Sequence, residues 1–427
     1  MDCWRRFLVS KVSVACSLLL VFILGLGAPV LASEQITVFL WKAWTGAQHG
    51  TVGEWLEVVK DEAESNFPNL KVHYHYVDWG ADPLVISIAG GVAPDASIAS
   101  IAYAFDLYDQ GVLMSLTEYW NRSSLVKYEF FPSAQIYNQF RGDIFGVPWS
   151  MEAHTIVYNA EMMEQAGLNS SPTALGSWDE LVAAARKMYR ADGSRVTVAG
   201  FTTGLNLPMF AAWLYANGGQ FYNNQFNGVA FNNQQGLETL TFLGDLLNLH
   251  RLGGLGGLPA FHAGQVGMLT NQIPAGALLH GATFRVGQTD FPPGPSGKRR
   301  STVGWSNMYV IPEAAKNPDL AWAWIETMVS IPMQAALTEI HEPMSPYRQA
   351  FGSSTAREVF RQRPYIANTP DILAAAGPYP YIRYDETSRV ANPLLTQVAN
   401  GTMAPTAALD EISRLMDQIL IDVGRPK

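Results

Sequence analysis

The sequence predicts an α/β protein built on doubly wound sheets, and three observations support this fold class. Strand-like and helix-like segments alternate between residues 36 and 110. The segment 36–41 is apolar on both faces apart from Thr37, which is typical of a strand buried in a parallel sheet. About 395 residues follow a predicted leader segment, and this length favours two lobes over a single core.

The first helix is expected over 52–67. Thr51 and Glu54 have the spacing of a capping box, which satisfies exposed backbone N–H groups at a helix start. Apolar residues then recur every fourth position on one helix face: Trp55, Val59, Ala63 and Phe67. The pattern therefore indicates an amphipathic helix that covers the sheet.

The alternation continues with a strand over 70–76, where Leu70 and Val72 point one way and Lys71 and His73 the other. A helix is expected near 84–89, a strand over 96–99 and a helix over 104–110. In such a sheet, ligands bind beyond the carboxyl ends of the strands.

Further elements are expected downstream. Ser177 and Glu180 form a second capping box that opens a helix. The remaining expected elements are a strand over 155–158, a helix within 229–250, a strand over 305–311, a helix over 320–329 and a last helix with an apolar stripe over 409–423.

The first 32 residues have the pattern of a secretory signal peptide. Arg5, Arg6 and Lys11 precede or flank a short apolar run over 12–26, and Val30-Leu31-Ala32 offers small residues for cleavage. The run breaks at glycines and a proline, so it is short for a membrane span. We expect a mature chain that begins near Ser33 and lies in the periplasm.

Both cysteines, Cys3 and Cys16, fall within this segment. The mature chain is therefore expected to form neither a disulfide nor a thiolate metal site. Lipid anchoring at Cys16 is not expected, because Ser13 stands where a lipobox has leucine and most of the apolar run follows the cysteine.

The charge balance excludes some partners. The formal net charge is −9, and removal of the leader makes the chain still more acidic. Nucleic acid and anionic membranes would repel such a protein. The dense basic cluster Lys298-Arg299-Arg300 follows a Gly/Pro-rich stretch and is interpreted as a solvated loop.

Several segments, taken in order, resemble the family 1 extracellular solute-binding proteins of ABC importers, which include maltose and other sugar binders. Each segment is weakly specific, but together they span nearly the whole mature chain. They are 90–95 (GGVAPD), 110–113 (QGVL) with Leu116, 146–148 (GVP), 157–159 (VYN), 167–168 (GL), 216–219 (ANGG), 261–268 (FHAGQVGM), 317–324 and 400–401.

The resemblance implies a two-lobed periplasmic-binding-protein fold of type II, with hinge crossings that join the lobes. The crossings are expected near 149–154, near 303–307 and shortly after Phe351. The N-terminal lobe would hold 33–149 with 305–352, and the C-terminal lobe 150–304 with 353–427. The resemblance also implies capture of a solute between closing lobes and its delivery to the membrane subunits of an ABC permease, without catalysis or a cofactor. A monomer is expected.

Aromatic residues at strand ends indicate a sugar site, because sugars offer weakly apolar ring faces and hydroxyl edges. Trp41 ends the first strand and Trp44 lies in the loop beyond it. Asp78 and Trp79 follow the second strand and offer a hydrogen-bond acceptor beside an aromatic ring. The alternative interpretation of the three tryptophans is packing in the core. For Asp78 the alternative is a capping role in the loop.

The resemblance adds further candidate ligand-binding residues. Ser100 and Tyr103 match positions that contact sugar in relatives, and Glu152 matches a carboxylate that accepts hydrogen bonds from sugar hydroxyls. Such charge-assisted bonds are stronger than neutral ones. Three more candidates lie in the second crossing or the C-terminal segment: Trp305, Asn307 and Arg389.

Other conspicuous residues are interpreted as structural. Asp95 follows a proline at a strand entrance, and Trp213 is expected in a helix core. Trp322 and Trp324 lie on an amphipathic helix and are expected to be core or surface residues, not ligand contacts. His73 and His75 share a strand face, but no third ligand is near in sequence, so no metal site is expected.

Two alternatives remain open at this stage. The same aromatic residues and acids would suit a secreted glycosidase, although no spacing forces two carboxylates into a catalytic pair. The fold could also bind a polyamine, iron or a phosphorylated polyol. The supply of aromatic residues favours a neutral carbohydrate over these solutes.

Overall fold

The computed structural model describes residues 34–42, 50–137, 139–140, 142–273, 281–340 and 344–423. The predicted leader with its cysteines, and Trp44, lie outside the described residues. Residues Glu34–Lys427 form one compact unit. Within the described part of the chain, no helix is both long enough and apolar enough to cross a membrane.

Most strands belong to one mixed sheet in the order β2-β1-β3-β11-β6-β9-β8-β7, with β10 beside β6 and β12 beside β11. The strands of this sheet are β1 (Glu34–Trp41), β2 (Leu70–Val77), β3 (Ala96–Ser100), β6 (Val147–Asn159), β7 (Arg190–Asp192), β8 (Arg195–Thr202), β9 (Val266–Ile273), β10 (Val286–Thr289), β11 (Thr302–Val310) and β12 (Ala376–Pro378). β4 (Gln139–Phe140) and β5 (Asp143–Ile144) form a separate pair.

The helices come in two groups along the chain. Before the long strand β11 lie α2 (Gly50–Asn66), α3 (Asp82–Ala89), α4 (Ile101–Asp109), α5 (Thr117–Arg122), α6 (Pro132–Tyr137), α7 (Ala160–Gln165), α8 (Trp178–Met188), α9 (Leu207–Ala216), α10 (Gln234–Asp245) and α11 (Gly257–His262). After it lie α13 (Pro318–Met328), α14 (Ile331–Ile340), α15 (Arg348–Phe351), α16 (Ser354–Gln362), α17 (Thr369–Ala375), α18 (Tyr384–Ala399) and α19 (Pro405–Leu420).

The first three strands form the predicted doubly wound unit. β1 pairs in parallel with both β2 and β3, so the chain runs outward from β1 to β2 and then back across to β3. Because each crossover is right-handed, this reversal places α2 and α3 on opposite faces of the sheet. The ends of β1 and β3 therefore meet at a topological switch point, where open sheets bind ligands.

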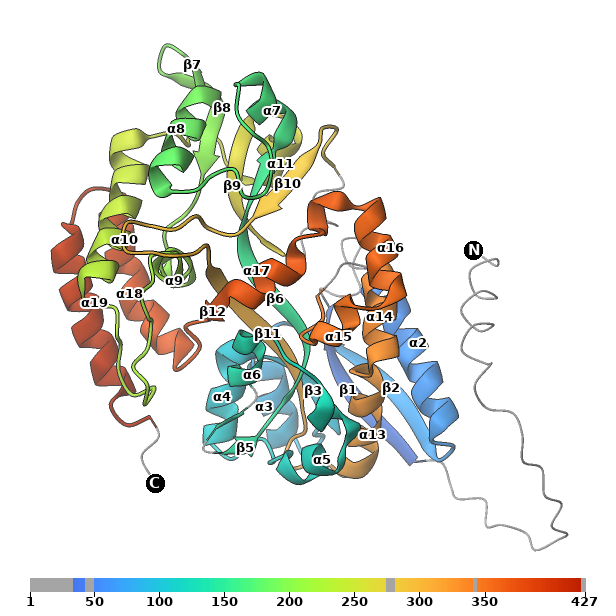
Figure 1. Ribbon diagram of the computed structural model, residues 1–427. Coiled ribbons are helices and arrows are strands. Elements are labelled where there is room, and N and C mark those ends of the chain that lie inside the picture. The colour runs from blue at the N-terminus through green and yellow to red at the C-terminus, as the bar shows by residue number, and fades with distance from the viewer. Residues whose placement is uncertain are drawn as a thin grey trace, which may run out of the picture. The chain divides into compact units, whose positions relative to one another are not determined.

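Two long strands carry the chain between the two halves of the fold (Figure 1). The first half of β6 pairs with β11, and its second half pairs with β9 and β10. β11 likewise pairs with β3 near its end and with β12 at its start. The two sheets that the sequence predicts are thus hydrogen-bonded into one through these shared strands, as expected for a two-lobed fold of type II.

Gly304 shows how closely the strands approach here. It lies on β11 between β6 and β12, and a Cβ atom at this position would lie 2.9 Å from the Cβ atom of Ala376. A larger residue would therefore push β12 away from the crossing.

Most of the aromatic side chains form cores. Trp55 stacks on Trp149 with ring centroids 5.7 Å apart, and Tyr309 lies edge-on to Trp324 at 4.8 Å. Among the tryptophans that the structure describes, only Trp79 and Trp305 are not buried. The core position predicted for Trp213 is confirmed, and Trp322 and Trp324, for which a core or a surface position was expected, lie in the core.

Two local predictions fail. α2 begins at Gly50, so Thr51 lies within its first turn and is not the N-cap that a capping box requires. Arg300 is not part of a solvated loop: its side chain is only 18% exposed and its Nε atom lies 2.5 Å from Asp290 Oδ1. Lys298 and Arg299 are exposed, as expected. The second capping box is confirmed in part. The Ser177 hydroxyl accepts from the Glu180 N–H as predicted, but the Glu180 carboxylate accepts from the Gly176 N–H and not from that of Ser177.

Candidate ligand-binding site

The carboxyl ends of the first three strands bring together the first group of candidate residues. Trp41 is the last residue of β1, and Trp79 lies just beyond β2. The Trp79 indole is 61% exposed and lies 6.4 Å from the Trp41 ring and 5.8 Å from the Tyr103 ring, centroid to centroid. The structure therefore forms an aromatic group from three segments that are distant in sequence. We call Trp41, Trp79 and Tyr103 the N-terminal aromatic group.

Ser100 and Tyr103 follow β3 because the helix α4 starts there. Ser100 is the N-cap of α4, and its hydroxyl accepts a hydrogen bond from the Ala102 N–H. This cap starts the helix three residues earlier than the sequence pattern indicates. Tyr103 is buried in the first turn of α4, and burial raises the pKa of its hydroxyl, which stays neutral.

Asp78 lies next to Trp79 but points into solvent. Its carboxylate forms an ion pair with Lys42 at 3.0 Å, and its side chain is 78% exposed. Arg389 is an exposed residue on α18. The structure thus places both residues on the surface. Among the other described candidates, Trp79 is exposed but belongs to the N-terminal aromatic group, and the rest are buried or half-buried.

The two crossing strands contribute a buried carboxylate. Glu152 on β6 lies opposite Trp305 on β11, and Asn307 lies opposite Ser150. The Asn307 amide donates a hydrogen bond of 2.7 Å to Glu152 Oε1 and a longer one of 3.2 Å to Ser150 Oγ. The pairing of β6 with β11 therefore brings together three candidates that the sequence predicts separately: Glu152, Trp305 and Asn307.

Glu152 is almost fully buried, at 8% exposure. Burial raises the pKa of its carboxyl to about 7, although hydrogen bonds from Asn307 and Trp305 work in the opposite direction. The carboxyl therefore keeps its proton to a higher pH than an ordinary glutamate. It can accept hydrogen bonds as a carboxylate and donate one as an acid.

His154 lies two residues beyond Glu152 on the same face of β6. Its ring is 5.0 Å from the Trp305 ring, and its Nδ1 atom is buried with no hydrogen-bond partner among the described residues. Burial lowers the pKa of His154 to about 4, so the imidazole is neutral at physiological pH.

Two tyrosines extend the cluster at Trp305. The Tyr379 ring lies 5.6 Å from Trp305, and the Tyr384 ring lies 5.3 Å from Tyr379. Both are half-buried. We call Trp305, Tyr379 and Tyr384 the hinge aromatic group, since it lies beside the crossing of β6 and β11.

Sequence reasoning missed Ser150, His154 and Tyr379. The first two could have been found, because Ser150, Glu152 and His154 alternate with apolar residues as on a strand with one polar face. Tyr379 could not, since its position depends on the short strand β12, whose sequence Ala-Gly-Pro carries no strand signal.

Chemically, the site offers aromatic rings, a carboxyl, an amide and hydroxyls. The described residues contain no group of three or more side chains suited to hold a metal ion.

Three residues noted in the sequence lie outside the site. His73 and His75 are exposed on β2. Asp95 has the structural role predicted for it, because its carboxylate accepts from the Thr37 and Asn317 N–H groups at 2.9 and 2.8 Å.

The family of bacterial extracellular solute-binding proteins matches residues 46–335 of the chain. The chain belongs to this family. A curated relative along nearly the whole length is a binding protein of Brucella abortus (strain 2308), with 24% identity over 93% of this chain and 96% of the relative.

Solved structures of solute-binding proteins share the fold. The cyclic α-maltosyl-1,6-maltose binding protein of Arthrobacter globiformis superimposes with a TM-score of 0.78 at 18% identity, covering 92% of this chain and 100% of that protein. The GacH receptor of Streptomyces glaucescens GLA.O, solved alone and with acarbose, gives 0.75 at 20% identity, covering 91% and 99%. This solute-binding protein thus has the two-lobed architecture of type II.

Proposed function

We propose that this solute-binding protein captures a neutral carbohydrate beside the crossing of β6 and β11 and delivers it to the membrane subunits of an ABC importer. The single observation that carries the proposal is the buried Glu152–Asn307 pair, which lies beside the hinge aromatic group, with Ser100 of β3 opposite Asn307. Flat rings suit the apolar faces of a sugar, and the polar pair suits its hydroxyls.

The likeness to receptors for acarbose and for a cyclic maltose dimer supports the choice of carbohydrate. The proposed ligand-binding residues are Trp41, Trp79, Ser100, Tyr103, Glu152, Trp305 and Asn307. Asp78 and Arg389 remain weaker proposals, because each would need to turn from solvent toward the ligand. Trp44, which lies outside the described residues, also remains a proposal.

We also propose that the two lobes follow the predicted division, with residues 33–149 and 305–352 in one lobe and 150–304 and 353–427 in the other. The pairing of β6 and β11 supports crossings near 149–154 and 303–307. The third boundary is the one change that we propose to this division. α16 packs against α14 of the first lobe, so the third crossing would lie between α16 and β12, and residues 353–362 would belong to the first lobe. The protein would act in the periplasm as a monomer after removal of its leader.

A sugar panel tests the proposal. We expect at least one mono- or oligosaccharide to change the tryptophan emission and to raise the melting temperature, because a ligand that binds only the folded state stabilises it. The exposed Trp79 and the half-buried Trp305 make the emission sensitive to binding. If no sugar changes either signal, the carbohydrate proposal is wrong.

The same samples separate binding from catalysis. We propose that the protein is not an enzyme, so incubation with the bound oligosaccharide should release no new reducing ends. Release of reducing ends that is lost in Glu152→Gln would favour a secreted glycosidase instead.

A further inference from the structure

Two segments concentrate positive charge in this acidic chain. The segments are 186–195, from the end of α8 to the start of β8, and 246–254, which follows α10. They contain one acidic residue, Asp192, whereas the whole chain has 37 acidic and 28 basic residues. Their exposed basic residues are Arg186, Lys187, Arg190, Arg195 and Arg251.

Contacts between the two segments bring these residues onto one surface. Arg186 Nη2 lies 2.8 Å from His250 Nδ1, which joins the end of α8 to the residue before Arg251. A Cβ atom added to Gly254 would lie 3.1 Å from Val196 Cγ2, so the chain after Arg251 runs beside the hairpin of β7 and β8. We call the five basic residues the basic patch. The elements β7 and α8 lie at one end of the fold, away from the crossing of β6 and β11 (Figure 1).

The basic patch has no acidic partner within the part of the chain that the structure describes. Other exposed arginines, such as Arg285, Arg361 and Arg414, each form an ion pair with a nearby glutamate. In contrast, the hydrogen bonds that Arg190 and Arg251 donate go to backbone carbonyls. The positive charge of the basic patch therefore remains accessible to an anionic partner.

An exposed leucine lies at the basic patch. Leu249 precedes His250, and its exposed fraction is 70%. The guanidinium groups of arginine suit phosphate, because they offer parallel N–H donors to its oxygens. An apolar side chain beside such cations suits the boundary between lipid headgroups and acyl chains. A nucleic-acid backbone has no apolar layer of this kind, so the combination favours a lipid surface.

The net negative charge of the chain does not prevent such a contact. At physiological ionic strength, charges more than about 8 Å apart are largely screened from one another. A surface that touches the basic patch therefore interacts chiefly with the patch itself. The repulsion expected from the sequence applies to the molecule as a whole at longer range.

We propose that the basic patch and Leu249 form a docking surface for the anionic phospholipid headgroups of a membrane. The docking is reversible and keeps the protein near the membrane without requiring a lipid anchor. The inference goes beyond the capture of a solute and does not depend on it.

Sedimentation with phospholipid vesicles tests the inference. One set of vesicles contains phosphatidylglycerol and phosphatidylcholine in equal parts, and the other contains phosphatidylcholine alone. The protein used begins at Ser33, because the apolar run over 12–26 would itself bind lipid and residues Glu34–Lys427 form a compact unit of their own.

Two double variants remove the same charge from different places. The patch variant is Lys187→Gln with Arg195→Gln, and the control variant is Lys298→Gln with Arg299→Gln. All four residues are exposed. The control residues follow Ser296, which bonds to Asn217 beside the start of α10, whereas the basic patch lies beyond the end of this helix, about 18 Å away.

We expect the wild type to bind vesicles with phosphatidylglycerol at least about tenfold more tightly than vesicles without it. Each cation near an anionic surface contributes about fivefold in affinity, so the patch variant should bind about 25-fold more weakly. The control variant should stay within about threefold of the wild type, because its cations lie away from the contact. A rise in NaCl from about 50 to about 300 mM should abolish binding.

Leu249→Ser and a DNA duplex separate a lipid surface from a nucleic-acid surface. Leu249→Ser should weaken vesicle binding by about fivefold, because the leucine loses its burial in lipid. The affinity of every variant for sugar should be unchanged, since none of these residues lies at the proposed ligand site.

The inference is overturned if both kinds of vesicle bind equally, or if the patch and control variants lose the same affinity. Binding of the DNA duplex that depends on the patch, without vesicle binding, would instead identify a nucleic-acid surface. Vesicle binding that Leu249→Ser leaves unchanged would contradict the contact of the leucine with lipid.

Discussion

Glu152 determines much of the chemistry at the residue scale. Its pKa is raised from 4.5 to about 7 by burial, so protonation favours the folded state. The stability that its protonated form contributes is fully present below pH 4.5 and is lost as the pH rises through 7. His154 acts in the opposite direction, because burial lowers its pKa from 6.5 to about 4 and the neutral imidazole favours the folded state. The stability that the neutral form contributes is fully present above pH 6.5 and is lost as the pH falls through 4.

Glu152→Gln isolates the first of these effects. Glutamine resembles the protonated acid, so the wild type should lose stability relative to the variant as the pH rises from 5 to 7.5. The expected change in the difference in unfolding free energy is at most about 3 kcal/mol. Urea unfolding of both proteins at the two pH values measures it. A difference that does not vary with pH would show that Glu152 is ionised normally in the fold.

Asn307 is the second residue to test. Asn307→Leu removes the donor to Glu152 Oε1 and leaves a buried carboxyl without this partner. We expect a loss of about 2 kcal/mol of stability and a much weaker affinity for the ligand. Ser115→Ala is a suitable control, since Ser115 is an exposed residue with hydrogen bonds outside the site. Unchanged affinity in Asn307→Leu would mean that the polar pair does not bind the ligand.

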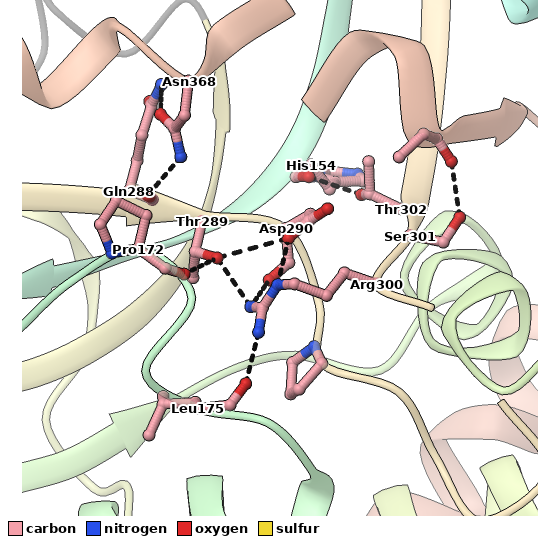
Figure 2. A network of polar contacts seen from close by, with 12 residues as sticks. His154, Pro172, Leu175, Gln288, Thr289, Asp290, Arg300, Ser301, Thr302 and Asn368 are labelled. Atoms are coloured by element: carbon pink, nitrogen blue, oxygen red, sulfur yellow. Dashed lines mark hydrogen bonds and ion pairs between the residues drawn. The ribbon is translucent and has the colours of Figure 1, made fainter. Parts of the chain in front are cut away.

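At the scale of single elements, the segment from β10 to β11 is held by Arg300. Figure 2 shows the guanidinium among Asp290, Thr289 and the Leu175 carbonyl, with Thr289 in turn bonded to the Pro172 carbonyl. Next to it, Ser301 donates to the Ala375 carbonyl and Thr302 to that of His154. The network therefore anchors β11 close to the crossing.

Arg300→Met should lower stability by about 3 kcal/mol, because Asp290 would remain as a partly buried charge without its partner. Arg361→Met provides the matched control. It removes an exposed ion pair with Glu358, which contributes little because water screens both charges. Chemical denaturation of both variants gives the comparison, and similar small losses in both would contradict the anchoring role.

Arg300 also shows why some elements could not be predicted. The sequence pattern correctly predicts β1, β2, β3 and the helices between them, because buried parallel strands and amphipathic helices have strong periodicity. The strand ends in turn located Trp41 and Trp79. In contrast, β10 and β12 are short and contain glycine or proline, so nothing local showed that Arg300 would face Asp290 or that Tyr379 would face Trp305.

At the scale of the whole molecule, one ion-pair cluster joins the two predicted lobes. Arg383, which precedes α18, lies 3.5 Å from Asp109 and 3.8 Å from Asp106 on α4. Its backbone has a φ of 49°, a left-handed conformation that is unfavourable for a residue other than glycine. Nearby, Phe105 and Tyr381 are in edge-to-face contact at 5.9 Å.

Burial raises the pKa of Asp106 to about 6, while Arg383 lowers it and Glu386, Asp109 and Asp385 raise it further. The ion pair should therefore be stronger at pH 8 than at pH 5, where Asp106 is largely protonated. A double-mutant cycle with Arg383→Met and Asp106→Asn should give a coupling of about 1 kcal/mol at pH 8 and a smaller one at pH 5. A coupling that is absent at pH 8 would exclude this contact as a link between the lobes.

The central claim is that a carbohydrate binds at the Glu152–Asn307 pair, beside the hinge aromatic group. A crystal structure of the protein saturated with the tightest sugar of the panel tests it most directly. We predict a sugar ring stacked on the hinge aromatic group, with a hydroxyl within hydrogen-bond distance of Glu152. Sugar density at another place on the molecule, with Glu152 and Trp305 untouched, would contradict the account.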